Sequence, residues 1–341
     1  MKLKKILIDT LKYVFFLGLG LFLFWLSMRK LDFDEMMQEI ANADYLWAVI
    51  GLVLAIISHV FRSLRWNLLI NSMGYKTRLS TTFYALMVGY MANTAVPRMG
   101  EFMRCGVLSK KERIPFNALL GTVISERLFD FIVLLLLLLA VVLTQWSLLG
   151  EFVVRMTQPL IDKIETNMGI LFLLGAIGLV VFIVSIWLYF KHKDNFRKLP
   201  GYEKIHNLLI GLAQGIRTID RMKQKGLFLF HTAMIWFFYI LMMYIPFRML
   251  PETEGLSFMA GVTLLAIGSL GIVAPVPGGI GAYHFIAKAV LTELYAISGT
   301  AAGSFAVITH AAQSILNVLV GAIGYVMLFF VDHKPPSNDK S

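Results

Sequence analysis

The sequence predicts an all-α, polytopic membrane protein, and three observations support that class. Hydrophobic residues make up 58% of the 341 residues and charged residues only 15%, whereas a soluble domain is about one quarter charged. Several apolar runs reach the ~20 residues that cross ~30 Å of hydrocarbon. Lys and Arg gather in alternate connecting segments. We expect about six full transmembrane helices plus two oppositely oriented re-entrant helical hairpins, arranged like an inverted repeat.

The N-terminal part predicts two spans joined outside the membrane. Residues 13–28 follow a basic start and lack a small-residue cleavage site, so we interpret them as a retained anchor rather than a signal peptide. Residues 31–44 are acidic with apolar residues at helical spacing, which indicates an amphipathic helix outside. Residues 45–61 return to an inner loop, 67–79.

A helix breaker and charge follow the next apolar run, residues 80–96, beginning at Pro97. Because bare backbone and bare charge are costly within hydrocarbon, such an end must face protein or trapped water. A full crossing would place Lys110 and Lys111 outside, against the charge of the flanking loops. We therefore predict a re-entrant hairpin over about 80–110, entered and left from the cytoplasm.

The middle of the chain predicts two more spans and a surface helix. Residues 116–149 form one long helix, 150–167 an outer loop, and 169–190 the return. Residues 202–225 carry apolar residues at helical spacing and end in a cluster of Arg and Lys. That pattern is typical of a helix on the inner leaflet, held there by anionic lipid.

The C-terminal part predicts a second hairpin. Residues 227–247 span outward, and the next apolar run is broken by Pro275 and Pro277. A hairpin over about 257–295 would therefore enter from the outside and return there. Residues 299–330 then span inward to the C-terminus.

This topology predicts a multi-pass protein of the bacterial inner membrane with both termini in the cytoplasm. A single integral membrane domain covers residues 1–331, and a polar tail covers 332–341. Most of the 31 Lys and Arg residues fall in predicted inner segments; those in predicted outer segments are Arg29, Lys30, Arg155, Lys163 and Arg248. Since the positive-inside rule accounts for the formal charge of +10, no nucleic-acid partner is expected.

The two broken segments resemble each other. Each has an apolar helix, a proline, a glycine-containing loop, a short helix, and a long apolar helix with an early polar position. Because one hairpin is predicted to enter from each side, the pair resembles the oppositely oriented broken helices that flank the midplane site of transporters.

Arg98, Glu101 and Arg104 follow the first break at three-residue spacing, so on a helix they share roughly one face. Two interpretations stay open. They form either a juxtamembrane cation cluster with an internal salt bridge, or a site for a lipid phosphate, which Arg binds through paired hydrogen bonds.

Glu126 and Asp130 interrupt the start of the most apolar segment at i, i+4 spacing, with Arg127 beside Glu126. They can form a structural ion pair to the first hairpin. They can also act directly, because ionisable residues inside a membrane are functional by default.

The second break contributes a glycine-rich turn made of Pro277, Gly278, Gly279 and Gly281. Such a turn allows close backbone approach and leaves free N–H groups at the start of the next helix, an arrangement that binds anions. No Gly-Lys-Ser/Thr follows it, so it is not a nucleotide-binding loop.

Polar side chains follow that turn. His284 and Lys288 share one helix face, and Lys288 can bind a phosphate or extend to the outer headgroups. His310 and Gln313, with Asn317, form a polar stripe on the last span. A histidine there can shuttle protons or make a helix–helix hydrogen bond.

Other chemistry is not indicated. The single Cys105 excludes an internal disulfide and a cysteine-cluster metal site. His284 and His310 have no carboxylate at metal-ligand spacing, and no nucleophile motif such as Gly-x-Ser-x-Gly occurs. We expect no metal, no cofactor and no catalytic residue.

Three blocks of sequence are similar to the membrane domain of lysylphosphatidylglycerol synthases and their flippase-like relatives. They are PRMGEFMR at 97–104, SERLFD at 125–130 and PGGIG at 277–281, and the likeness extends over about residues 10–330. In that family the third block usually continues to a glutamate near His284, and an arginine often stands at the place of His310. These departures indicate a different lipid headgroup or a different proton partner.

The resemblance implies movement of a lipid, such as an anionic or aminoacylated phospholipid, between the leaflets. The family's synthases add a soluble aminoacyl-transferase domain, which we do not expect here because the sequence ends soon after its last apolar helix. Two alternatives stay open: a membrane-embedded enzyme acting on a lipid or polyprenyl phosphate, and a scaffold that docks a separate lipid-modifying synthase.

The hypothesis assigns the polar residues to two half-sites. In the first, three arginines bind the lipid phosphate and three carboxylates orient them or take protons; in the second, basic and imidazole groups face the other side. The members are Arg98, Arg104 and Arg127, then Glu101, Glu126 and Asp130, then His284, Lys288 and His310.

Overall fold

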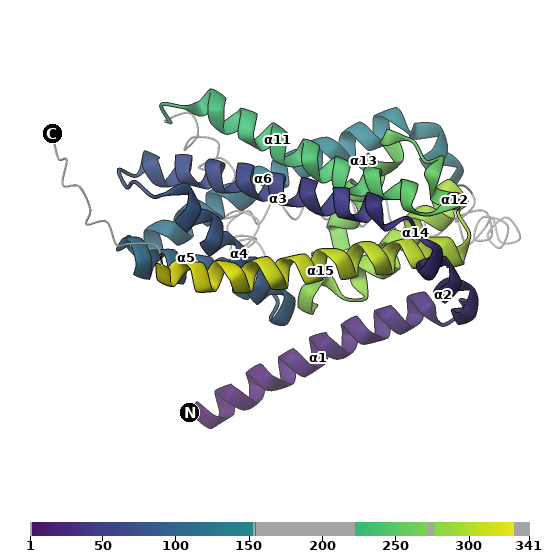
Figure 1. The fold of residues 1–341 in the computed structure, drawn as a ribbon, viewed down its shortest axis with the longest axis horizontal. Coiled ribbons are helices and arrows are strands. Elements are labelled where there is room, and N and C mark those ends of the chain that lie inside the picture. The colour runs from purple at the N-terminus through teal and green to yellow at the C-terminus, as the bar shows by residue number, and fades with distance from the viewer. Residues whose placement is uncertain (1, 153, 155–221, 272–275, 331–341) are drawn as a thin grey trace, which may run out of the picture. The chain divides into compact units, whose positions relative to one another are not determined.

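The computed structural model describes residues 2–152, 154, 222–271 and 276–330, and the regular secondary structure among them is helical (Figure 1). The chain divides into two compact units, Met1–Val141 with Arg221–Ser341, and Val142–Asp220. The predicted outer loop 150–167, span 169–190, surface helix 202–225 and tail 332–341 lie wholly or largely outside the described residues.

The first unit is built from long helices and from shorter ones that pair across breaks. The long ones are α1 (Lys2–Met28), α3 (Tyr45–Ser72), α6 (Phe116–Thr144, which ends in the second unit), α11 (Lys225–Tyr244) and α15 (Gly299–Phe330). The shorter ones are α2 (Phe33–Asn42), α4 (Leu79–Ala95), α5 (Met99–Glu112), α13 (Phe258–Leu270) and α14 (Ala282–Tyr295), with connecting turns η1 (Ile245–Met249), α12 (Pro251–Glu254) and η3 (Pro277–Gly279).

Four helices among the described residues are long and apolar enough to cross a membrane: α3, α6, α11 continued through η1, and α15. A fifth span is present if α1 and α2, which meet at 92°, count as one. The sequence-based class, an all-helical polytopic membrane protein, is therefore confirmed for the described part of the chain. The predicted number of about six spans stays a prediction.

The predicted inner loop 67–79 is wrong at its start, because α3 continues to Ser72. Helical order persists since Trp66, Leu69 and Ile70 are all buried in the core formed with α4, α5 and α6. The helix ends before Gly74, whose φ of +87° suits only glycine well. Arg62 and Arg65 therefore lie within α3, and both are buried.

The first break separates α4 from α5 at 96–98. Val96 is extended because the residue before a proline disfavours helix, and Arg98 takes a left-handed conformation with φ +61°. α5 then begins under a cap from α4, in which the Gly100 N–H donates to Asn93 Oδ1 at 2.7 Å. Gly100 allows the two helices to approach closely at this cap.

The second break separates α13 from α14 through η3. Gly278 and Gly281 both have positive φ, +59° and +80°. The Gly281 N–H donates to His284 Nδ1 at 3.3 Å, which caps the start of α14. A side chain at Gly281 would overlap the Gly20 carbonyl of α1, so this glycine also lets α1 dock.

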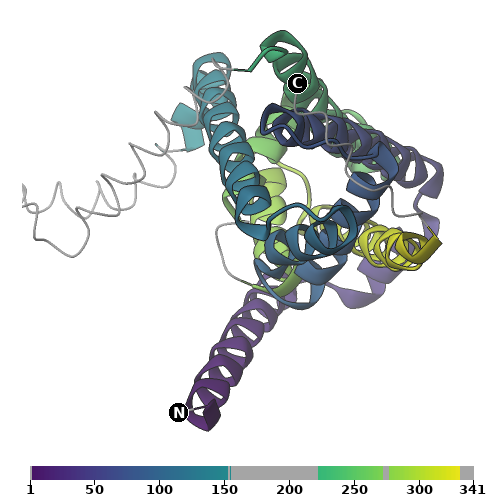
Figure 2. The ribbon, with the colours of Figure 1, turned by 90° about the vertical axis from the view of Figure 1, so that its left-hand side faces the viewer.

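The two breaks meet. η3 packs against α4, and a Cβ built on Gly278 would lie 3.3 Å from the Thr94 carbonyl oxygen near the end of α4. α4 also packs along α15, and the end-on view has these two helices side by side, blue and yellow (Figure 2). Helix α4 therefore packs against α5, its partner in the first broken pair, and also against η3, the turn of the second.

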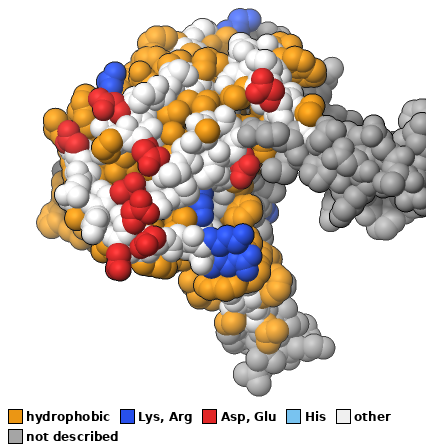
Figure 3. Space-filling view, turned by 90° about the vertical axis from the view of Figure 1, so that its right-hand side faces the viewer, with side chains coloured by type: hydrophobic (Ala, Val, Ile, Leu, Met, Phe, Trp, Pro, Cys, Tyr) orange, Lys and Arg blue, Asp and Glu red, His pale blue; other side chains and the backbone are white. Residues whose placement is uncertain are grey.

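Charge is separated between the two ends of the first unit. Figure 3 views the end that carries α2 and α12, where Asp and Glu side chains gather; those on the two helices include Asp34, Glu35, Glu252 and Glu254. At the opposite end in Figure 1, α5 finishes with Lys110 and Lys111 and α11 begins with Lys225. This polarity agrees with the predicted outer and inner faces.

The close approach of α4 and α5 predicts that Gly100→Ala destabilises the protein. A Cβ there would overlap the Gly89 carbonyl oxygen and lie 2.6 Å from Asn93 Cγ, and overpacking of this kind costs about 1–3 kcal/mol. We expect a lower melting temperature in detergent. The control is Gly106→Ala on the same helix, where nothing lies within 4 Å; equal melting temperatures for the two variants would contradict the packing.

Candidate functional site

A group of charged side chains lies buried between α3, α5 and α6. Arg62 and Arg65 of α3 both approach Glu126 of α6, whose side chain is 0% exposed. Arg62 Nη2 lies 2.6 Å from Glu126 Oε1, and Arg62 Nε donates to the same oxygen at 2.8 Å. Arg65 Nη2 lies 3.4 Å from it. One carboxylate therefore pairs with two arginines that lie one helical turn apart.

Asp130, one turn further along α6, completes the pairing with α3. Arg65 Nη1 lies 2.8 Å from Asp130 Oδ1, and Arg62 Nη2 lies 3.2 Å from Oδ2. Arg62 also donates from Nη1 to the Tyr239 hydroxyl of α11 at 2.8 Å. These bonds join α3, α6 and α11 through polar side chains that lie between the helices.

Arg104 reaches the same carboxylate from α5. Its Nη1 lies 3.2 Å from Glu126 Oε2, and its guanidinium carbon lies 4.6 Å from the centre of the Trp66 ring. The residue is only 2% exposed. Its Nη2 has no hydrogen-bond partner among the described residues. Arg104 is therefore held on one side and left with free donor capacity on the other.

This buried cluster carries an excess of positive charge. It contains three guanidinium groups, on Arg62, Arg65 and Arg104, against two carboxylates, on Glu126 and Asp130. Removing a charge from water costs several kcal/mol per ion unless a partner compensates it. Among the described residues, this cluster therefore has one more cation than carboxylates.

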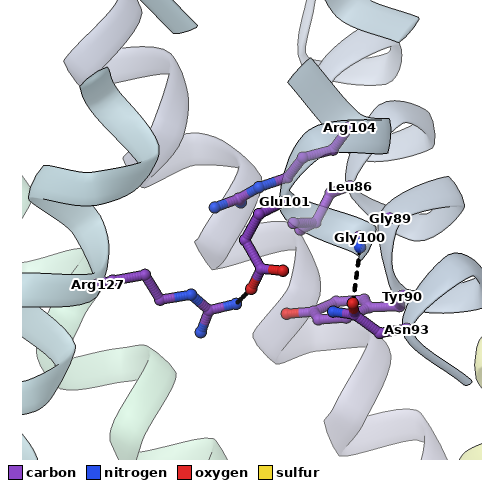
Figure 4. A pocket seen from close by; sticks show the side chains of 8 residues that line it. All are labelled: Leu86, Gly89, Tyr90, Asn93, Gly100, Glu101, Arg104 and Arg127. Carbon is purple, nitrogen blue, oxygen red and sulfur yellow. Dashed lines mark hydrogen bonds and ion pairs between the residues drawn. The ribbon is translucent and has the colours of Figure 1, made fainter. Parts of the chain in front are cut away.

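A small pocket opens beside Arg104 (Figure 4). Its mouth carries a second ion pair, in which Arg127 Nη2 donates to Glu101 Oε1 at 2.7 Å. Four polar atoms of its lining residues have no hydrogen-bond partner among the described residues: Tyr90 Oη, Glu101 Oε2, Arg104 Nη1 and Arg104 Nη2. Of these, Arg104 Nη1 is ion-paired with Glu126. The residues that line the pocket are Leu86, Gly89, Tyr90, Asn93, Gly100, Glu101, Arg104 and Arg127.

The structure separates Arg98 from the residues predicted to share its face. Arg98 precedes α5 in a left-handed conformation and is exposed, whereas Glu101 and Arg104 sit on the helix. The i, i+3 argument holds only within one helix, and α5 begins at Met99, the residue after Arg98. The predicted common face is therefore wrong for Arg98 and correct for Glu101 and Arg104, which both line the pocket.

Two central residues, Arg62 and Arg65, are absent from the sequence-based site. Their position after an apolar run suggested the end of a span. A usable signal was present, however: their i, i+3 spacing on one face matches the i, i+4 spacing of Glu126 and Asp130. Two cations and two carboxylates on similarly spaced faces of apolar helices indicate a buried ion-pair network.

The residues after the second break form another cluster. His310 Nε2 lies 2.9 Å from the Gly278 carbonyl oxygen. The rings of His284 and His310 are 4.6 Å apart, and Tyr283 stacks on His310 at 5.6 Å. Among the predicted residues of this half, His284 and His310 are thus brought together against the turn.

Lys288 and Gln313 lie in other contacts. Lys288 Nζ donates to the Ser27 carbonyl oxygen near the end of α1 at 2.6 Å, where a cation is favoured by the helix dipole. Gln313 donates to Asn317 at 3.2 Å within α15. Lys288 therefore binds α1 to α14 in this structure.

Helix α4 connects the two clusters. Tyr90 and Asn93 line the pocket, and Thr94, the next residue, packs against Gly278. The His59 ring lies 4.6 Å from the Tyr90 ring, tilted by 41°. Within the described ranges no group of three or more His, Cys, Asp or Glu side chains could hold a metal ion.

The fold and the site together define a polytopic helical membrane protein with a buried cluster of ion-paired arginines and carboxylates beside two broken helix pairs that meet. Within that class, the chain belongs to the family described as "Lysylphosphatidylglycerol synthase TM region", which matches residues 11–321. The family resemblance carried by the three sequence blocks is therefore confirmed.

Curated relatives come from archaea. A UPF0104 membrane protein of Methanocaldococcus jannaschii is 24% identical over 327 residues, covering 91% of this chain and 92% of that protein. A UPF0104 membrane protein of Methanothermobacter thermautotrophicus is also 24% identical, covering 92% and 93%. Glycosyltransferase AglD of Haloferax volcanii is 21% identical, covering 91% of this chain but 53% of that protein. No solved structure matches.

The charge imbalance predicts an asymmetric response to substitution. Glu126→Gln leaves three buried arginines with one carboxylate, whereas Arg104→Met leaves two arginines and two carboxylates. Breaking a buried pair so that charge is left uncompensated costs about 3–5 kcal/mol. We expect Glu126→Gln to lower the melting temperature in detergent far more than Arg104→Met. The reverse order would contradict the excess of positive charge.

Proposed function

We propose that this protein is a lipid translocator, which moves a phospholipid or related lipid-linked substrate between the leaflets of the membrane. The observation that carries the proposal is the buried cluster of Arg62, Arg65 and Arg104, whose charge exceeds that of its carboxylates. Its uncompensated cation has free donor capacity beside a pocket. A lipid phosphate is the anion that a membrane supplies in quantity, and guanidinium binds it well.

The paired breaks support movement rather than static binding. In the proposal, α4 with α5 is a re-entrant hairpin from the cytoplasm, and α13 with α14 is one from the outside, within about six full spans and with both termini cytoplasmic. Broken helices in opposite orientations surround the midplane site of many transporters. Contact between Thr94 and Gly278 brings the two proposed tips together, so a headgroup would pass from one to the other.

In the proposal, the site residues have distinct roles. Arg104 and Arg127, which line the pocket, would bind the phosphate, while Glu126 and Asp130 hold the neighbouring arginines in place. Arg98, exposed at the break, would attract the headgroup from the membrane surface. The second half-site would consist of the Gly278–Gly281 turn with His284 and His310, and Lys288 would keep α1 docked beside it.

One comparison favours a second candidate function, an enzyme acting on a lipid or polyprenyl phosphate. A relative over 91% of this chain is named a glycosyltransferase, although the matched region is 53% of that protein. Under this alternative the same arginines would bind the phosphate of a lipid carrier. Product formation from a lipid extract by the purified chain, without flipping, would favour it over translocation.

The translocator proposal predicts that Arg104→Met slows lipid movement. Proteoliposomes of phosphatidylcholine and phosphatidylglycerol would carry fluorescent phosphatidylglycerol, and dithionite would quench the label only in the outer leaflet. Loss of a hydrogen-bonded charge is worth about 1.5–3 kcal/mol, so we expect flipping at least ~10-fold slower.

The matched control is Arg78→Met, which removes an exposed arginine at the start of α4. It should flip lipid at the wild-type rate. Wild-type flipping by folded Arg104→Met protein would show that the cluster does not bind the substrate. No flipping by the wild-type protein with any phospholipid tested would reject translocation itself.

The proposed topology predicts which side of the membrane each end of the first unit faces. A membrane-impermeant maleimide should label Lys110→Cys only from the cytoplasm and Glu254→Cys only from the outside. The native Cys105 is 0% exposed and should give little background. Labelling of both positions from the same side would contradict the opposed hairpins.

A further inference from the structure

We propose that Glu101 is a built-in competitor of the ligand, whose carboxylate occupies the place that the phosphate of an anionic lipid takes when it binds. This inference rests on the proposed function and names the ligand chemistry of its site: a phosphodiester monoanion held by Arg104, Arg127 and the first turn of α5.

The position of Glu101 suits this role. Figure 4 places its side chain between those of Arg104 and Arg127, at the mouth of the pocket. Glu101 Oε1 accepts from Arg127 Nη2 at 2.7 Å. Glu101 also lies in the first turn of α5, where the helix dipole favours an anion, whether carboxylate or phosphate.

Of the carboxylates at this site, Glu101 is the one that can leave. Glu126 is enclosed by three arginines at 0% exposure, and Asp130 pairs with two. Glu101 forms an ion pair with Arg127, and the two side chains are 23% and 43% exposed. Surface ion pairs of this kind contribute about 0–1 kcal/mol. Glu101 Oε2 lacks a hydrogen-bond partner among the described residues, so little holds the second oxygen.

The pocket requires such a displacement. With Glu101 in place it has room for about one water molecule, so a phosphate cannot enter. When the carboxylate swings out, Arg127 and the free Nη2 of Arg104 face the same space. Two guanidinium groups and a helix N-terminus then match a single phosphate charge with its unshared oxygens.

The test measures affinity rather than transport. Purified full-length protein in a nonionic detergent would be titrated calorimetrically with dihexanoyl-phosphatidylglycerol, with glycerol 3-phosphate and with inorganic phosphate. Removing the competing charge by Glu101→Gln should tighten binding of the short-chain lipid about 10-fold. The matched control is Glu112→Gln, which makes the same charge change at the other end of α5 and should bind as the wild type does.

The direction of the effect separates it from damage to the fold, because a merely destabilised variant would bind more weakly. The gain should vanish in Glu101→Gln combined with Arg127→Gln. Equal affinities for wild type, Glu101→Gln and Glu112→Gln would overturn the inference even if flipping occurs. A gain for inorganic phosphate and glycerol 3-phosphate but not for the lipid would overturn the lipid source. A gain for the lipid without any flipping would support this site and reject translocation.

Discussion

Glu126 joins three helices of the first unit through one carboxylate, and most of the charged interior depends on it. Arg62 and Arg65 approach one of its oxygens from α3, and Arg104 approaches the other from α5. In a membrane the helices gain little by burying apolar surface against each other, since lipid is equally apolar. Interhelical ion pairs therefore do much to fix how α3, α5 and α6 lie around the pocket.

That constraint also limits what the carboxylates can do. A glutamate surrounded by three guanidinium groups stays ionised and fixed in place, because losing its charge would leave the arginines uncompensated. Glu126 is better suited to orienting Arg104 than to carrying a proton. The Glu101–Arg127 pair at the pocket is, by contrast, partly exposed and made by a single hydrogen bond.

Sequence alone predicted the helical membrane class, both breaks, and the bounds of α15, because proline, glycine and hydropathy act locally. It also singled out Glu101 and Arg104, which share the pocket wall. It missed Arg62 and Arg65 because their role depends on which helix faces α3, a tertiary fact. The interpretation of Arg98 failed for a local reason, since Arg98 has a left-handed backbone conformation and α5 begins only after it.

The meeting of the two breaks was likewise beyond sequence reasoning. Apolar periodicity can indicate that a helix is interrupted, but it cannot say where the interruption lies relative to another one. In the structure, η3 comes close to the backbone of Thr94 because Gly278 has no side chain. Gly278, which the sequence places in a possible ligand-binding turn, also serves as a packing contact between η3 and α4.

The stacking of Arg104 over Trp66 gives the protein an optical reporter of its own site. The indole lies fully buried beneath the guanidinium, at 4.6 Å, and its Nε1 donates to Thr122 Oγ1 at 2.8 Å. A cation above an indole face alters the energy of its excited state, so the emission of this tryptophan is tied to the position of Arg104. A movement of Arg104 toward the pocket is therefore expected to change the fluorescence of Trp66, which is buried.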